Sequence, residues 1–79
     1  MEIALIEKSE KGTLKLNLYD EGLSLVESDT FSDLYTLNFH LQTLAKKRNI
    51  EKGLLVVHDR DKDTVSLSLA HDEHSFFIS

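Results

Sequence analysis

Short apolar blocks, separated by polar and glycine-containing turns, divide this chain of 79 residues into elements. Residues 2–8 carry a continuous apolar run, which is typical of a strand buried on both faces. Residues 13–19 alternate strictly between leucine and polar side chains, which predicts a half-buried strand. Residues 23–27 complete a first group of three strands, with turns at residues 9–12 and 20–22.

A single amphipathic helix of about 18 residues is predicted after the third strand. Residues 30–33, Thr-Phe-Ser-Asp, fit a capping box at its start, and Ser28 or Asp29 is an alternative cap. Asn49 is expected to take the left-handed conformation that ends the helix. Leucines recur at spacings of three and four residues and form the core stripe: Leu34, Leu37, Leu41 and Leu44.

The second half of the chain predicts three more strands. Residues 53–58 form a central apolar strand, and residues 59–63 form a polar turn. Residues 64–70 alternate again, with the apolar side chains expected inward and the serines outward. After a turn at residues 71–73, residues 74–78 supply a last strand that contains two phenylalanines.

The predicted order of elements is βββ-α-βββ in one domain over residues 1–79. This order indicates an α+β fold, a mostly antiparallel twisted sheet with the amphipathic helix packed on one face. Hydrophobic residues make up 41% of the chain, which is within the globular range. The pattern leaves the order of strands across the sheet open.

Composition narrows the function classes. The chain has no cysteine, which excludes disulfide frameworks, thiol chemistry and cysteine-ligated zinc. Its longest apolar run, residues 54–57, is far shorter than the roughly 18 residues of a membrane span. The first residues lack the basic start and long apolar stretch of a secretion signal. We therefore expect a cytoplasmic protein that does not associate with membranes.

Acidic residues outnumber basic ones and gather in turns. The chain has 9 Lys and Arg against 14 Asp and Glu, a net charge of −5 at pH 7. Such a chain is a poor direct binder of nucleic acid, because phosphate backbones attract cations. A one-signed surface steers a protein onto a basic partner. Solubility and turn formation are the alternative explanation for the acidic turns. They contain Asp59, Asp61, Asp63, Asp72 and Glu73.

The spacing of Asp59, Asp61 and Asp63 matches the opening of a calcium loop. However, Thr64 and Ala70 occupy the positions where an EF-hand needs glycine and glutamate. The neighbouring segments also read as strands rather than helices. The sequence therefore favours an ordinary polar turn over a metal site.

Histidines offer the other metal candidate. His71 and His74 flank two carboxylates, and His58 precedes the same predicted hairpin. Structural zinc sites use four ligands, usually including cysteine, so we expect a solvated turn and no metal. A metal- or pH-responsive protein remains an alternative. The chain also lacks a nucleophile elbow, a glycine-rich phosphate loop and a Cys-His pair, so we expect no catalytic residues, no cofactor and no enzyme activity.

Aromatic residues suggest two binding surfaces. Phe31, Tyr35 and Phe39 follow a spacing of four residues beside the leucine stripe. We expect Phe31 and Tyr35 in the core and leave Phe39 open between core and surface. Phe76 and Phe77 are adjacent in the last predicted strand, so they point to opposite faces, and one of them is a candidate docking residue.

The leading functional hypothesis is a non-catalytic protein-binding module, a small acidic inhibitor or adaptor. Small acidic proteins that occlude basic or nucleic-acid-binding surfaces, including those that phages use against host defences, share this size and charge. The alternative is a structural or regulatory homo-oligomer, such as a homodimer, joined through the apolar C-terminal edge strand. The candidate partner-binding residues are Asp59, Asp61, Asp63, Asp72, Glu73, Phe39, Phe76 and Phe77.

Overall fold

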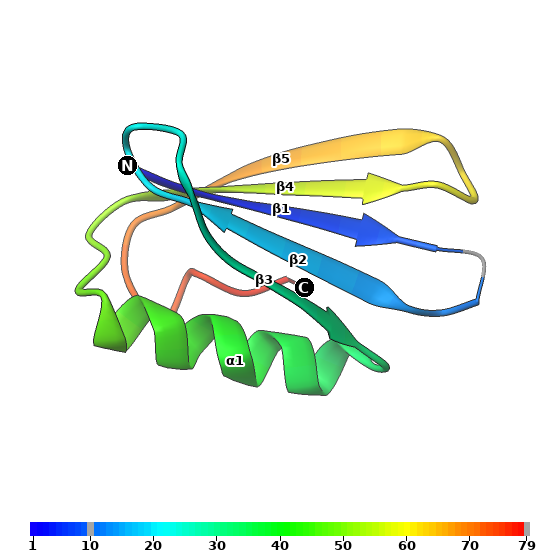
Figure 1. Ribbon diagram of the computed structural model, residues 1–79, viewed down its shortest axis with the longest axis horizontal. Coiled ribbons are helices and arrows are strands. Elements are labelled where there is room, and N and C mark those ends of the chain that lie inside the picture. Colours follow the sequence, from blue (N-terminus) through cyan, green and yellow to red (C-terminus); the bar gives the residue numbers. More distant parts are fainter. Residues whose placement is uncertain (10, 79) are drawn as a thin grey trace.

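A computed structural model describes residues 1–9 and 11–78. It confirms an α+β fold, a five-stranded sheet with one helix in the order βββ-α-ββ (Figure 1). Glu10, in the turn predicted at residues 9–12, lies outside the described residues. The elements are β1 (Glu2–Lys8), β2 (Leu14–Tyr19), β3 (Leu25–Phe31), α1 (Leu34–Lys47), β4 (Gly53–Asp59) and β5 (Thr64–Ala70).

The strand order, which the sequence pattern left open, is β3-β2-β1-β4-β5. β1 is the central strand, and its pairing with β4 is parallel while the other three pairs are antiparallel. Ala4 of β1 lies opposite Leu18 of β2 and Leu55 of β4. Because paired residues point to the same side of a sheet, these three side chains share one face.

That face carries the hydrophobic core. α1 packs across β2 and β3 on this side of the sheet (Figure 1). The leucine stripe meets the sheet as predicted, because Leu37 and Leu41 are fully buried and Leu44 nearly so. We call this side the helix side. Its buried strand residues are Ala4, Ile6, Leu14, Leu16, Leu18, Leu55 and Ala70.

The sixth strand predicted at residues 74–78 does not form, and residues 71–78 follow a different path. They turn under the sheet and run along its helix side, beside α1 (Figure 1). The Asp72 carboxylate closes the turn by accepting hydrogen bonds from the backbone N–H groups of His74 and Ser75, both 2.9 Å away. The segment then places the Phe76 ring, with no exposed surface, against Gly53 of β4.

The helix begins later than predicted. Residues 28–30 pair with β2, so the first two residues of the proposed capping box belong to a strand that ends at Phe31. Asp33 is the cap instead, because its carboxylate accepts a 2.7 Å hydrogen bond from the Thr36 amide. α1 therefore has 14 residues. Asn49 has the expected positive φ of 53° after its end.

Candidate protein-binding surfaces

The sheet has a second apolar face, opposite α1. In β5, Leu67 lies opposite Val56, and Val56 lies opposite Leu5 of β1. These positions alternate with the core positions, so their side chains point away from the helix. No element of the described chain, residues 1–9 and 11–78, covers them (Figure 1). We call this surface the open face, and its apolar residues are Ile3, Leu5, Leu54, Val56, Val65, Leu67 and Leu69.

The predicted orientation of β5 was therefore wrong. Ser68 lies opposite Leu55 on the helix side, whereas Leu67 and Leu69 lie on the open face. Their side chains are 67% and 60% exposed, and Val65 is 61% exposed. A strict alternation of apolar and polar residues is compatible with either orientation of β5. The small residues Gly53 and Ala70 lie opposite each other on the helix side, and this fixes the orientation.

Exposure on the open face is continuous rather than scattered. β1 and β4 contribute half-buried Ile3, Leu5, Leu54 and Val56, and β5 contributes three residues that are mostly exposed. Contiguous exposed apolar surface of this kind marks interaction sites, whereas single exposed leucines need no explanation. The open face is thus the strongest candidate for a binding surface on the molecule.

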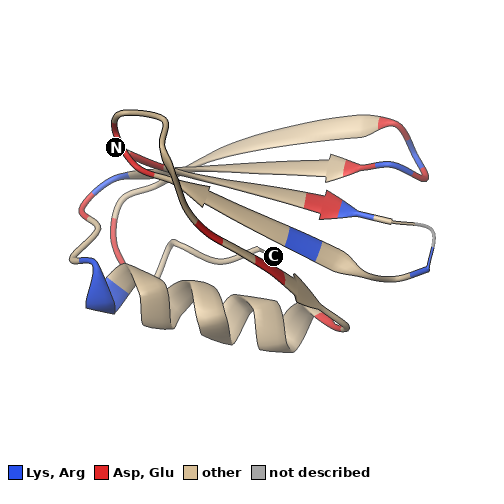
Figure 2. Ribbon diagram, in the orientation of Figure 1, with Lys and Arg blue, Asp and Glu red and all other residues tan. Residues whose placement is uncertain are grey.

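The turn after β2, at one end of the open face, is acidic, whereas the other end carries charges of both signs (Figure 2). The turn after β2 carries Asp20 and Glu21, whereas the turn between β4 and β5 carries Asp61 and Asp63 together with Arg60 and Lys62. At the β4–β5 end, Glu7 of β1 faces Lys15 of β2 across the strand pair. The apolar surface is therefore bounded by negative groups at the β2–β3 turn and by groups of both signs at the β4–β5 turn.

The two acidic clusters chosen from the sequence do not meet. The β4–β5 turn follows Asp59, which pairs with Thr64, whereas Asp72 and Glu73 follow Ala70 at the opposite end of β5. The molecule is 32 Å long, so these clusters form separate surfaces. Asp61 and Asp63 are exposed and available to a partner.

Two of the candidate carboxylates have structural roles. One Asp59 oxygen accepts hydrogen bonds from the backbone amides of Asp61 and Lys62, at 3.1 and 3.3 Å. The Asp72 carboxylate accepts the hydrogen bond from the Ser75 backbone N–H described above. This hydrogen bond lowers the pKa of the Asp72 carboxyl, and interactions with His74 lower it by a smaller amount. Both residues shape turns, which is the alternative explanation considered for the acidic residues.

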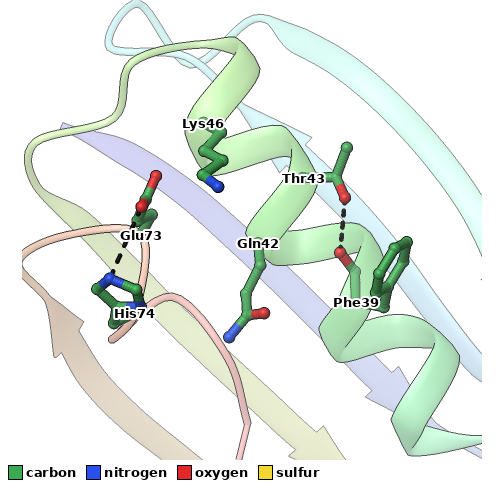
Figure 3. A pocket seen from close by; sticks show the side chains of 6 residues that line it. All are labelled: Phe39, Gln42, Thr43, Lys46, Glu73 and His74. Carbon is green, nitrogen blue, oxygen red and sulfur yellow. Dashed lines mark hydrogen bonds and ion pairs between the residues drawn. The ribbon is translucent and has the colours of Figure 1, made fainter.

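A shallow hollow of about 250 Å³ lies between α1 and the turn after β5, and Phe39 and Glu73 both line it (Figure 3). Lys46 lines its α1 wall, and His74 lies 3.7 Å from Glu73, Nε2 to Oε1. Phe39 is 66% exposed, so the surface alternative holds for this side chain. The hollow combines one cation, one carboxylate and one aromatic ring. The remaining lining residues are Gln42 and Thr43.

The other aromatic candidates divide between core and surface. Tyr35 was expected in the core but is 81% exposed, because it lies outside the stripe of α1 residues that faces the sheet. Phe31 belongs to β3 and packs against the core, with its ring centroid 5.1 Å from that of His40. Phe76 is a core residue, and its burial removes it from the candidate contacts, whereas Phe77 is 41% exposed.

The histidines are distributed over the molecule. His58 lies near the end of β4 with its Nε2 3.8 Å from Asp63 Oδ1, whereas His71 and His74 follow the opposite end of β5. Within the two described stretches, no three His, Asp or Glu side chains converge as metal ligands. His40 Nε2 donates to Glu27 Oε2 at 2.6 Å, because an ionised carboxylate only accepts. That contact ties α1 to β3.

The open face was not among the surfaces predicted from the sequence. Its signal was present in two apolar blocks, residues 3–6 and 54–57, which suit strands that are apolar on both sides. A single helix cannot cover both sides of a sheet, so the second side stays open.

In the part of the chain that the structure describes, no helix is long and apolar enough to cross a membrane. Comparisons with protein-family models, with curated proteins and with solved structures find no match to this chain.

Proposed function

We propose that this chain is a non-catalytic protein-binding module, a small acidic inhibitor or adaptor that binds its partner through the open face. The observation that carries the proposal is the apolar surface of β1, β4 and β5 on the side opposite α1. Burying a leucine or valine side chain fully contributes about 1.5–3 kcal/mol, so this surface is the strongest source of binding free energy on the molecule.

The partner is a protein whose apolar surface is flanked by lysine or arginine side chains. The reason is charge complementarity, because the turn after β2 at one end of the open face is acidic, the β4–β5 turn presents exposed Asp61 and Asp63, and the net charge is −5. In such an interface the apolar centre supplies affinity, and the charged rim raises the association rate and selects the partner. A basic groove of a nucleic-acid-binding protein has this chemistry.

Affinity capture from an extract of the native source tests the proposal with matched variants. Val56→Lys places a charge in the centre of the open face, and Gln42→Lys places the same charge on the exposed surface of α1. We expect Val56→Lys to reduce recovery of the partner at least tenfold, to about a tenth or less, because an unpaired buried charge is costly. Gln42→Lys should leave recovery unchanged. Equal recovery by both variants would contradict the proposal.

The acidic rim is tested separately with Asp61→Asn and Asp63→Asn together. Asp63 has a positive φ of 51°, a conformation that asparagine tolerates, and Asp59 is kept because it closes the turn. We expect slower association with the captured partner and a weaker dependence of that rate on salt. An unchanged rate and salt dependence would show that this turn is not part of the contact.

A further inference from the structure

The outer edge of β5 differs chemically from the other edge of the sheet. β5 ends the strand order, so its outer backbone N–H and C=O groups have no strand partner in the described part of the chain. Its seven residues, TVSLSLA, include no charged residue and no proline. β3, at the opposite edge, carries Glu27 and Asp29. Charges and prolines on edge strands prevent pairing with another chain, so β5 lacks the usual protection.

We propose that β5 pairs antiparallel with β5 of a second copy of this chain, around a two-fold axis at Leu67. In this register Leu67 faces its own counterpart and Val65 faces Leu69. Ser66 faces Ser68 on the other side of the sheet. Opposed residues share a face, so the apolar side chains meet on the open face and the serines meet on the helix side. β5 is therefore complementary to itself, which is the requirement for a symmetric interface.

The edge is free to accept a second copy. α1 packs over β2 and β3, and residues 71–78 run along the helix side, so neither blocks β5 (Figure 1). The first six of its seven residues are exposed. A single strand edge is smaller than the roughly 800 Å² per partner of a standard interface, so we expect a dissociation constant on the order of 10–100 µM. The two-fold axis is perpendicular to the sheet, so the open faces of both copies form one continuous surface.

Sedimentation velocity of the full chain, from about 10 µM to about 1 mM, tests this pairing. We expect reversible conversion from monomer to dimer. In Ser66→Lys/Ser68→Lys, like charges face each other twice, and the dissociation constant should rise at least about tenfold. In Ser66→Lys/Ser68→Glu, the same register places opposite charges face to face, and the dimer should be retained. A wild-type chain that stays monomeric, or two variants that behave alike, would overturn the inference.

Amide hydrogen exchange of the wild-type chain gives a second readout that needs no variant. Raising the protein concentration should slow exchange in β5 and leave the β3 edge unchanged; equal exchange in β5 at both concentrations would overturn the pairing. The pairing does not depend on the proposed function, since Val56 lies on β4, one strand inside the edge, and Val56→Lys leaves the outer backbone groups of β5 free to pair. If the wild-type chain stays monomeric and Val56→Lys still loses the partner, only the dimer is refuted. If the wild-type chain dimerises and Val56→Lys keeps the partner, only the proposed function is refuted.

Discussion

Asn38 on α1 and Ile78 near the end of the chain hold each other through two hydrogen bonds. The Asn38 Nδ2 group donates to the Ile78 carbonyl oxygen at 2.7 Å, and the Ile78 amide donates to Asn38 Oδ1 at 2.6 Å. A side-chain amide here pairs with the backbone as a neighbouring strand would. This pair fixes residues 71–78 on the helix side and explains why they form no sixth strand.

Asn38→Ala should destabilise the fold by about 1–3 kcal/mol, because the partly buried Ile78 backbone groups lose both partners. Asn38→Asp should also destabilise the fold, since it keeps the acceptor for the Ile78 amide but places a carboxylate oxygen against the Ile78 carbonyl oxygen. Gln42→Ala, on the exposed surface of the same helix, is the matched control and should stay within about 0.5 kcal/mol of wild type. Urea unfolding measures the differences, and equal values for Asn38→Ala and Gln42→Ala would contradict this role.

Gly53→Ala should destabilise the fold by about 1–3 kcal/mol through overpacking. A Cβ at this position would lie within 2.9 Å of Phe76 Cδ2 and closer still to Cε2. The cost should shrink in a Phe76→Leu background, which a double-mutant cycle measures by thermal or urea unfolding. Gly22→Ala is the control, because its nearest new contact is an ordinary 3.5 Å to Asp20 Oδ1. Additive effects of the two changes would contradict the contact.

Acid should weaken the fold partly through Asp33 at the start of α1. Hydrogen bonds from the Thr36 amide and hydroxyl lower the pKa of the Asp33 carboxyl in the folded state. A lowered pKa stabilises the fold above the unfolded value of about 3.9, and this contribution is lost as pH falls through the folded pKa. Asp33→Ala should therefore melt earlier than wild type at neutral pH, and the difference should narrow below about pH 4. A difference that stays constant down to pH 2, measured by circular dichroism, would refute the assignment.

Leu67→Thr should change stability by less than about 0.5 kcal/mol when measured on the monomer at low concentration, because the side chain is 67% exposed. Leu41→Ala should cost about 2–5 kcal/mol, because Leu41 is fully buried. If Leu67 pointed to the core, as its alternating pattern suggested, the two substitutions would have comparable costs. Urea unfolding of both variants separates the two orientations of β5.

Most elements followed from periodicity. The four-leucine stripe located α1, and the alternating leucines located β2, because burial on one side imposes these periods. The start of α1 was misplaced because Ser28, Asp29 and Thr30 have the chemistry of helix caps but pair with β2 instead. Several side chains before α1 are thus able to cap a helix. Because residues 28–30 pair with β2, Asp33 is the residue that caps α1.

The binding surface was harder to predict because it depends on strand order. Phe76 looked like an exposed edge residue, and only the Asn38–Ile78 contact and the space beside Gly53 explain its burial. Leu67 and Leu69 looked like core residues, and only their register against β4 places them on the open face. Contacts between segments that are distant in the sequence cannot be read from the local pattern of apolar and polar residues.

Site-specific photo-crosslinking in an extract of the native source tests most directly whether the open face is the binding surface. A photoreactive amino acid replaces Val56 in one sample and Gln42 in another. We expect a crosslink from position 56 to a protein with a basic surface, reduced by added Leu5→Lys, and no equivalent product from position 42. Crosslinking from position 42 alone would place the contact on α1 and contradict binding through the open face.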